Sequence, residues 1–373
     1  MNFGFTEEQD LLRAEVRKFL DQSCPLEEVR RLAETPDGFS RELWKQIAEL
    51  GWLGLTVPEA HGGADLGMVD LVVLLEETGR SLFPSPLVSS TLAQAALRLA
   101  GSPEQQARWL PRLADGTQVG TLAILEADDR LGAQGVRLRG ERDGEHLVLR
   151  GEKLFVHDAG AADLFVVALR SGEAAVSLAL VERDAAGVAA EDVPGVDLTK
   201  RTGRLRLDGV RVPRGALLGE EGAAGAALQR LLDTGATVTA AEMVGAAEAA
   251  LALTARYANQ RVQFGRPIGQ FQGVKHPLAE MHVDVESVKS LVYYAAWCLD
   301  GDHEDASLAA SRAKAYASEA FARIGIDAVQ LHGGIGYTWE YDAQLFLKRA
   351  RWARPAFGDT DHHYERVSTL GGL

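Results

Sequence analysis

The chain has 373 residues, of which 46% are apolar and 25% are charged, and its net charge at pH 7 is −14. A chain of this length buries a large core and is expected to form two or three domains. The acidic balance argues against a nucleic-acid or anionic-membrane surface, which needs clustered Lys and Arg, but it leaves room for a small anionic ligand held by local positive groups.

Residues 1–115 are predicted to form an all-helical N-terminal domain. Thr6 is followed by two glutamates, which is typical of a helix start. Leu43, Ile47 and Leu50 fall on one helix face. The beginning of the chain lacks the basic and apolar regions of a signal peptide, and no uninterrupted apolar run approaches the ~18 residues of a membrane span. We therefore expect a reducing, cytoplasmic setting and no membrane segment.

Residues 116–220 predict a central β-domain. Short apolar or alternating runs are separated by turn residues, as in antiparallel sheets. A domain of about 100 residues built in this way is expected to be a small barrel or sandwich. The expected strands are 122–125, 136–139, 147–149, 164–169, 176–181 and 205–212.

Residues 221–373 predict a C-terminal helical bundle. Gly265 and Pro267 end the first long helix, and small residues such as Gly245 allow close helix contacts or pairing with another subunit. The order of helices, β-domain and helices places the chain in the α+β class. The expected helices of this part are 228–260, 274–300, 304–331 and 339–353.

One candidate binding motif begins at Arg261, where the long helix ends. A guanidinium forms planar, bidentate hydrogen bonds to a diphosphate, while Gln263 and Phe264 offer an amide and a ring face for a ribose or an aromatic base. A surface arginine favoured by the helix dipole explains the same position. The residues alone leave both interpretations open.

A second candidate is the run Gly333-Gly334-Ile335-Gly336. Glycines let backbone N–H groups approach a ligand without obstruction by a Cβ atom. A helix C-cap followed by a tight turn is the alternative. No GxGxxG follows an expected strand, so the run is not a dinucleotide fingerprint.

A third candidate lies on the expected strand 151–158. Strict alternation places Lys153, Phe155 and His157 on one face, where they suit either a flavin or ordinary half-buried packing. No HExxH pair occurs, and Cys24 and Cys298 stand alone, so neither a metal site nor a disulfide is predicted.

These motifs together resemble the acyl-CoA dehydrogenase superfamily over essentially the whole chain. The resemblance implies a helical N-terminal domain, a central β-domain and a C-terminal four-helix bundle. It also implies a tetramer in which FAD lies between the β-domain and the bundle and reaches a neighbouring subunit. The motifs that carry the resemblance are Pro58-Glu59 with His61-Gly62-Gly63, Gly151-Glu152-Lys153, Arg261 to Gly265 with Gln272, and Gln330 with Gly333 to Tyr337.

The resemblance further implies which residues contact FAD. The arginine and glycine motifs hold the diphosphate and adenosine, and the strand residues border the flavin ring. The residues assigned in this way are Arg261, Gln263, Phe264, Gln272, Gln330, Gly333, Gly334, Thr360, Leu125, Phe155 and His157.

The position of the catalytic base departs from the family pattern. The family reaction removes two hydrogens from an acyl-CoA thioester and needs a carboxylate base opposite the flavin. Most members carry a Glu two residues before the Thr matched here by Thr360, and this chain has Gly358 there; the alternative position on the long helix is Gly235. No catalytic residue is therefore identified. The carboxylates that remain as candidates for a relocated base are Asp233, Asp359 and Asp361.

Three functions remain open. The first is an acyl-CoA dehydrogenase with a relocated base. The second is a non-catalytic partner subunit that clamps FAD for a catalytic paralogue in a hetero-tetramer. The second is favoured by a resemblance to bacterial members near Trp339-Glu340 and Gly358-Asp359. A flavin oxidase or monooxygenase that uses His157 is the third. For either dehydrogenase function we expect an acyl-CoA thioester as the substrate and a separate electron acceptor.

Overall fold

The computed structural model describes residues 4–172 and 175–373. The chain folds into two units, each assembled from separate segments. A helical unit comprises Met1–Arg31, Met68–Phe83 and Ala236–Leu373, and a mixed unit comprises Leu32–Gly67 and Pro84–Gly235.

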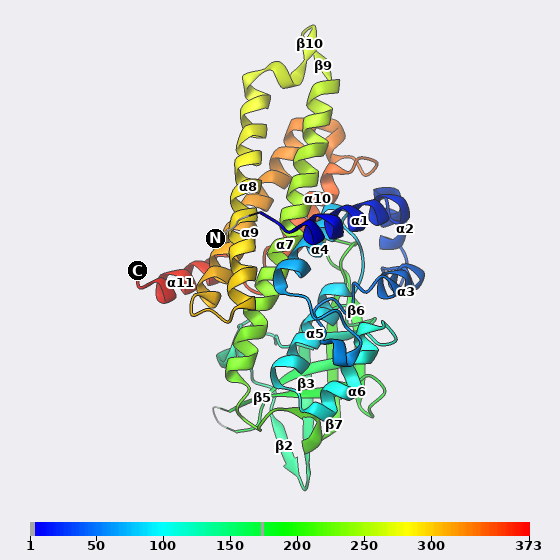
Figure 1. Ribbon diagram of the computed structural model, residues 1–373, viewed down its shortest axis with the longest axis vertical. Coiled ribbons are helices and arrows are strands. Elements are labelled where there is room, and N and C mark those ends of the chain that lie inside the picture. Colours follow the sequence, from blue (N-terminus) through cyan, green and yellow to red (C-terminus); the bar gives the residue numbers. More distant parts are fainter. Residues whose placement is uncertain (1–3, 173–174) are drawn as a thin grey trace. The chain divides into compact units, whose positions relative to one another are not determined.

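The helical unit is built around α9, which packs against α8, α10 and α11. Two long helices, α7 and α8, are joined at their tip by the short hairpin β9–β10 (Figure 1). The helices α2 and α7 continue into the mixed unit. The elements are α1 (Glu7–Ser23), α2 (Leu26–Ala33), α4 (Met68–Arg80), α7 (Gly225–Gln260), β9 (Val262–Gln263), β10 (Arg266–Pro267), η4 (Ile268–Gln270), α8 (Gln272–Asp300), α9 (Ala306–His332), η5 (Gly333–Tyr337), α10 (Ala343–Ala353) and α11 (Thr360–Gly371).

Glycines bring the backbones of α4 and α7 into direct contact. A Cβ atom on Gly79 would lie 2.1 Å from the carbonyl oxygen of Glu242, and one on Gly245 would lie 1.7 Å from that of Glu76. Any side chain at either position would push the helices apart. The expected close helix contact at Gly245 is therefore confirmed.

Helix α7 is apolar over most of its length. Of the helices described, it is the one long and apolar enough to cross a membrane by length and composition, and 72% of its most apolar window is buried inside the protein. Polar residues interrupt its apolar residues, so no uninterrupted apolar run of that length occurs in it. Buried core helices meet the same criterion, so we interpret α7 as a core helix.

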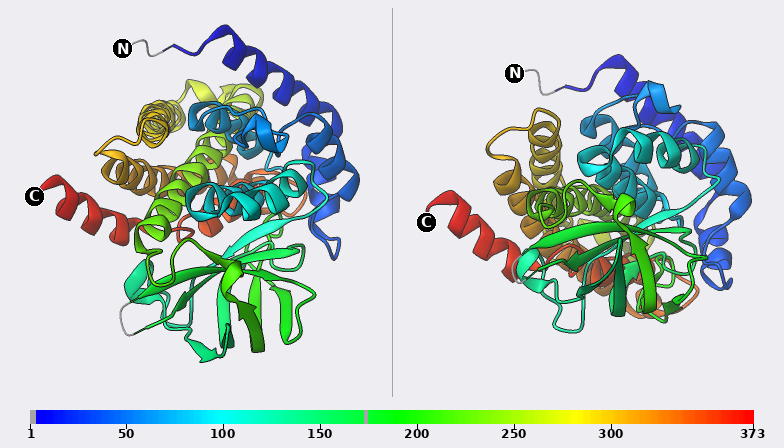
Figure 2. Two further views of the ribbon diagram at one scale, coloured as in Figure 1. Left: turned by 60° about the horizontal axis from the view of Figure 1, so that its bottom comes forward. Right: turned by 90° about the horizontal axis from the view of Figure 1, so that it is seen from below.

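The mixed unit contains two four-stranded sheets, in the orders β1-β4-β5-β8 and β2-β3-β7-β6. Helix α5 packs against β1, and β1 pairs with β4 in parallel. Figure 2 shows the cyan helices of this unit beside its green strands. The α+β fold class predicted from the sequence is confirmed. The elements are α3 (Arg41–Glu49), η1 (Glu59–His61), α5 (Leu87–Ala100), α6 (Pro103–Ala114), β1 (Gly120–Ala123), η2 (Ala133–Gly135), β2 (Gly140–Asp143), β3 (His146–His157), β4 (Leu164–Arg170), β5 (Val176–Glu182), β6 (Val188–Val193), β7 (Thr202–Pro213), η3 (Arg214–Ala216) and β8 (Leu217–Leu218).

Several local predictions were wrong. Residues 136–139 are not a strand, and the charged segment that follows them, β2, pairs with β3 instead. Strand β6 and helix α11 were missed. The alternation expected along β3 is broken by an irregularity between Lys153 and Val156, where Phe155 has φ +52°. As a result Lys153 is buried while Phe155 is exposed, so they do not share a face.

Candidate functional site

The tip of the α7–α8 hairpin presents the arginine motif to solvent. Helix α7 ends at Gln260, and Phe264 and Gly265 then adopt left-handed φ values of +52° and +79° to close the turn between β9 and β10. Arg261, Gln263 and Phe264 are all exposed, Phe264 to 92%. Side chains this open at a turn are available to a ligand or to another subunit.

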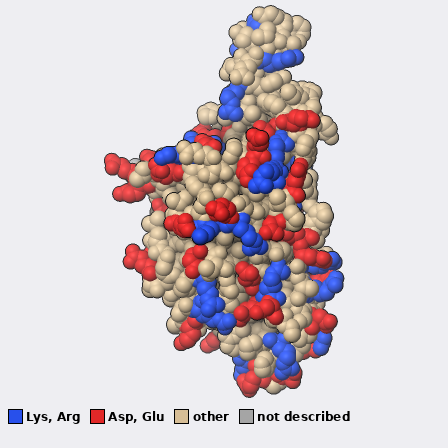
Figure 3. All heavy atoms as spheres, turned by 90° about the vertical axis from the view of Figure 1, so that its right-hand side faces the viewer, with Lys and Arg blue, Asp and Glu red and all other residues tan. Residues whose placement is uncertain are grey.

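This tip is also locally cationic on an acidic chain. Residues 249–279 contain no Asp or Glu. Figure 3 shows Lys and Arg, and no acidic side chain, at the protruding end of the hairpin. A cluster of this kind attracts an anion such as a diphosphate. The cations are Arg256, Arg261, Arg266 and Lys275.

The glycine bend follows α9 and is open on its outer side. Gly333 has φ +64°, and Gly336 is crowded because a Cβ there would lie 2.6 Å from the carbonyl oxygen of Val329. Gly334 has neither property, since no atom of the described chain lies within 4 Å of a Cβ built on it. Nothing within the described chain therefore requires a glycine at position 334, whereas the close approach of a ligand would. The bend is thus open to a ligand, and its contact with the diphosphate of FAD stays a prediction.

Three rings join the tip to the bend. The ring of Tyr257, on the last turns of α7, lies 4.5 Å from the ring of His332, the residue that precedes the bend. The ring of Tyr341 lies 4.8 Å from His332 and 6.2 Å from Tyr257. Burial lowers the pKa of His332, so its imidazole is neutral. Packing of these rings holds the two predicted cofactor motifs in one arrangement.

The segment around Gly358 leaves no room for a side chain at that position. Gly358 has φ +107°, and a Cβ there would lie 2.6 Å from Cδ2 of His362 and 2.7 Å from Nε2 of His363. Its carbonyl oxygen accepts a hydrogen bond of 2.9 Å from Nζ of Lys314. Histidine rings thus fill the space where a side chain at Gly358 would lie, and a hydrogen bond to its carbonyl group fixes the backbone there.

Lys314 lies on α9 and is completely buried. Its Nζ also donates to the carbonyl oxygen of Arg354 at 2.8 Å and to Oγ of Ser318 at 3.0 Å. Burial lowers the pKa of Lys314 to about 7, although the Asp359 carboxylate opposes that shift. In the protonated form of Lys314 the three bonds use all three ammonium donors, and they fix both ends of the segment 354–358.

His363 adds a second tie to the same segment. Its Nε2 donates to the carbonyl oxygen of Phe357 at 3.0 Å. Burial, with the positive charge of Lys314 as a smaller cause, lowers the pKa of His363 to about 3, so the ring is neutral at pH 7. The ring that would collide with a side chain at Gly358 is therefore itself held in place.

The other polar residues of this segment are engaged within the chain. Oγ1 of the buried Thr360 donates to Oε1 of Glu319 at 2.8 Å, and the same oxygen accepts from Nη2 of Arg354 at 2.6 Å. Asp359 caps α11 by accepting from the amide of His362 at 2.9 Å. Asp359 is therefore a helix cap, and the contact between Thr360 and FAD stays a prediction.

In the mixed unit, Lys153 anchors the strand that was expected to face the flavin. Its buried Nζ donates to Oε1 of Glu126 at 2.6 Å and to the carbonyl oxygen of Ile124 at 3.0 Å. The carbonyl oxygen of Leu125 accepts from the amide of Leu154 at 2.9 Å. This network fixes the backbone beside Leu125 and explains the inward turn of Lys153 at the bulge.

The two residues that follow on this strand differ in exposure. Phe155 is 54% exposed. Burial, together with the charge of Lys200, lowers the pKa of His157 to about 4, so its imidazole is neutral at pH 7.

Asp233, a candidate base on α7, is buried and accepts from Nε2 of Gln229 at 3.1 Å. The candidate base on α7 thus already has a partner on its own helix.

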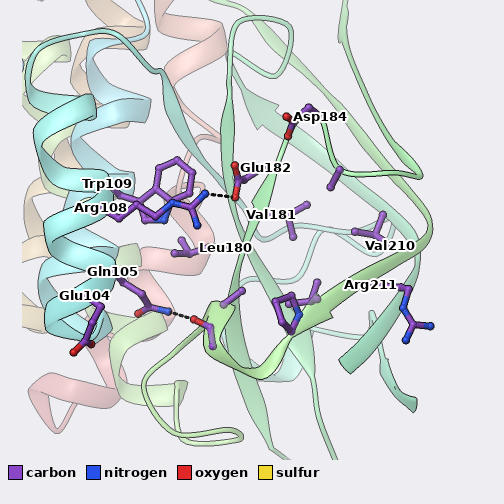
Figure 4. A pocket seen from close by; sticks show the side chains of 15 residues that line it. Glu104, Gln105, Arg108, Trp109, Leu180, Val181, Glu182, Asp184, Val210 and Arg211 are labelled. Atoms are coloured by element: carbon purple, nitrogen blue, oxygen red, sulfur yellow. Dashed lines mark hydrogen bonds and ion pairs between the residues drawn. The ribbon is translucent and has the colours of Figure 1, made fainter. Parts of the chain in front are cut away.

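A cavity of 440 Å³ in the mixed unit lies between α6, β5 and β7 (Figure 4). Arg108 at its edge pairs with Glu182 at 2.7 Å and covers the ring of Trp109, and Gln105 donates to the carbonyl oxygen of Gly215 at 2.9 Å. None of the predicted cofactor residues lines it.

Across the described residues, no group of three or more His, Cys, Asp or Glu side chains is placed to hold a metal ion.

Sequence reasoning missed Lys314 and Glu319. Both lie on α9, where a cation and a carboxylate occur among alanines. Lys314 is four residues from Ala310 and from Ser318, which puts it on the buried face of a helix. A buried position for a charged residue was the available signal.

Two family models match the chain. The one described as "Acyl-CoA dehydrogenase, C-terminal domain" matches residues 224–369, and the one described as "Acyl-CoA dehydrogenase, N-terminal domain" matches residues 6–117. The acyl-CoA dehydrogenase IpdE2 of Mycolicibacterium smegmatis is 34% identical over 363 residues, which cover 97% of this chain and 98% of that protein. An acyl-CoA dehydrogenase of Bacillus subtilis is 32% identical over 364 residues, 93% of each protein.

Solved structures show the same similarity. Butyryl-CoA dehydrogenase from Megasphaera elsdenii has a TM-score of 0.92 at 26% identity, with 100% of both chains covered. A chain of the ChsE4-ChsE5 complex from Mycobacterium tuberculosis has a TM-score of 0.91 at 28% identity, with 100% of this chain and 99% of that chain covered. PigA with FAD and proline has a TM-score of 0.92 at 25% identity, with 100% of both chains covered.

Proposed function

Because the chain belongs to the acyl-CoA dehydrogenase family, whose members are FAD-dependent oxidoreductases acting on CH–CH groups, we propose that it is the FAD-clamping subunit of a hetero-oligomeric acyl-CoA dehydrogenase. In this proposal a paralogue supplies the carboxylate base. The single observation that carries it is the crowding at Gly358, the position that the sequence pattern assigns to the family's base. The rings of His362 and His363 fill the direction in which a side chain there would point.

The chemistry divides between FAD and the protein. Bound FAD would supply the hydride acceptor for the β-carbon of the thioester. The residues of this chain bind and orient: Arg261 offers a bidentate guanidinium to the diphosphate, and Gly334 allows the backbone to approach it. Gly358 has no side chain, and the carboxylate of Asp359 caps α11 through Oδ1. Loss of a positioned base typically lowers a rate by ~10²–10⁴, which is why a second subunit is required.

A self-sufficient dehydrogenase is the alternative. It would need Asp233 to leave Gln229 and accept the α-proton. The oxidase or monooxygenase alternative would use the neutral imidazole of His157. Each alternative predicts flavin chemistry by this chain alone, which the partner-subunit proposal does not.

Flavin content after purification tests the proposal. The chain expressed alone is expected to contain little FAD and to leave an acyl-CoA unoxidised. Co-expression with a paralogue that carries the Glu is expected to give a complex with FAD that bleaches when acyl-CoA is added without oxygen. A chain that is purified alone with close to one FAD and bleaches with acyl-CoA would refute the partner role and support a relocated base; Asp233→Asn would then identify that base.

The assembly and its setting are also part of the proposal. We propose a tetramer with the paralogue, a separate electron acceptor and a cytoplasmic location. The ChsE4-ChsE5 complex, a similar structure that contains two different proteins, supports the hetero-oligomer. We also retain the division into domains 1–115, 116–220 and 221–373. Sedimentation of the co-expressed complex, with the ratio of the two chains, measures the assembly directly.

A further inference from the structure

Arg30 on α2 reaches across the helical unit to the segment that follows the glycine bend. Its Nη1 donates to the carbonyl oxygen of Trp339 at 2.6 Å, and its Nη2 donates to that of Tyr341 at 2.9 Å. Nη2 and Nε both donate to Oδ1 of Asp342, at 2.8 and 3.1 Å. All three guanidinium nitrogens thus bind one four-residue segment, and the side chain is only 18% exposed.

Among the described residues, few other contacts hold this segment besides its ring packing. The amide of Leu345 donates to the carbonyl oxygen of Asp342 at 2.9 Å, and Nζ of Lys348 lies 4.4 Å from the centre of the Trp339 ring. Within it, the amide of Tyr341 donates to the carbonyl oxygen of Thr338 at 3.4 Å, a long and weak bond. Nε2 of Gln344 reaches the carbonyl oxygen of Trp339 at 3.5 Å, which is equally weak. The short, charge-assisted bonds from Arg30 are therefore the main tether.

The tethered segment carries one of the rings that join the cofactor motifs. Tyr341 packs against His332, which precedes Gly333, and against Tyr257, one helical turn before Arg261. A shift of Tyr341 would therefore displace the rings that lie beside the bend and beside the arginine motif. We propose that Arg30 is a positioning residue that sets the geometry of the FAD clamp through Tyr341. This inference rests on the proposed FAD-binding function.

The chain offers a matched control on the same helix. Arg31 is the next residue, and its side chain is 62% exposed and pairs with Glu28 one turn earlier at 2.6 Å. An exposed pair of this kind contributes little to stability. Arg31→Met therefore removes the same guanidinium and charge, and keeps an apolar stem, without touching the segment 338–342. Arg30→Lys keeps a charge at position 30 but cannot reproduce a planar fork with four bonds.

Hydrogen exchange of the full-length, flavin-free chain is the first measurement. Arg30→Met is expected to speed exchange in peptides covering 333–342 and to leave those from α9 unchanged, while Arg31→Met exchanges like the wild type. In the complex with the paralogue, the dissociation constant for FAD is expected to rise about 10-fold for Arg30→Met, a change of about 1.4 kcal/mol. The effect is this small because only part of the loss of the charge-assisted bonds reaches the clamp.

The remaining outcomes decide between positioning and general instability. Saturating FAD is expected to restore the turnover of the Arg30→Met complex, which a misfolded subunit would not allow, and Arg30→Lys is expected to recover less than half of the lost affinity. Wild-type exchange and wild-type FAD affinity in Arg30→Met would overturn the inference, as would full rescue by Lys. If the wild-type complex binds no FAD at all, the proposed function fails, while the exchange measurement still shows whether Arg30 orders the bend.

Discussion

Replacing Gly358 by alanine tests whether the position that the sequence pattern assigns to the base has no room for a side chain. The left-handed φ of +107° costs a non-glycine residue about 1–2 kcal/mol. The new methyl group would lie 2.6 Å from His362 and 2.7 Å from His363, and overpacking of this kind costs about 1–3 kcal/mol. His363 cannot move freely because it is bonded to the carbonyl of Phe357. The sum predicts a loss of about 3 kcal/mol in the free energy of unfolding for Gly358→Ala.

Gly62→Ala separates the two contributions. Gly62 has φ +83°, but no atom lies within 4 Å of a Cβ built on it, so only the backbone cost applies. We expect Gly62→Ala to lose about 1 kcal/mol. Urea unfolding followed by tryptophan fluorescence, carried out on both variants and the wild type, measures the difference of about 2 kcal/mol.

Equal losses in the two variants would refute the reasoning, since the rings of His362 and His363 would then not fill the space beside Gly358. The same geometry predicts the outcome for Gly358→Glu. That variant is expected to be destabilised at least as much as Gly358→Ala and to gain no dehydrogenase activity. Activity in Gly358→Glu would show that the segment 354–358 can open to admit the family's base.

Three further predictions concern pH, a buried ion pair and the arginine motif. The pKa of His363 is lowered to about 3 and that of His157 to about 4, chiefly by burial, whereas both titrate near 6.5 when unfolded. Unfolding therefore takes up protons at a pH between 6.5 and 4. The free energy of unfolding is expected to drop, as the pH falls through this range, by up to about 1.4 kcal/mol per pH unit for each histidine. Equal free energies of unfolding in urea titrations at pH 7 and pH 5 would contradict this. Lys153→Met leaves Glu126 without its cation and is expected to cost about 3 kcal/mol, the lower end for a broken buried pair because Glu126 is 14% exposed; an unchanged urea midpoint would show that the pair adds no stability. Arg261→Lys is expected to weaken FAD binding by the complex about 10–100-fold without changing the urea midpoint, since a lysine cannot form the bidentate bonds; unchanged affinity in a fluorescence titration would remove Arg261 from the clamp.

The features that sequence determined are those with a local physical signal. The periodicity of apolar residues placed α7, α8 and α9 within a few residues of their ends, because burial of one helix face requires that spacing. The helix end before Arg261 was also predictable, because the glycine and proline just beyond it cannot continue a helix. The prediction that Gly358 stands where the family has its base rests on a local signal of the same kind, the residue type at a position defined by its neighbours.

Only the tertiary structure decided which residues far apart in the chain contact each other. The bulge that buries Lys153 depends on Glu126, a partner on a different segment, and alternation along one strand carries no information about it. Lys314 meets the carbonyl of Gly358, and Arg30 meets that of Trp339, only because packing brings α9 and α2 to those segments. Every residue has a backbone carbonyl group, so no sequence pattern marks the one that will accept a hydrogen bond from a distant side chain. The donor and the acceptor are known only once the helices are packed.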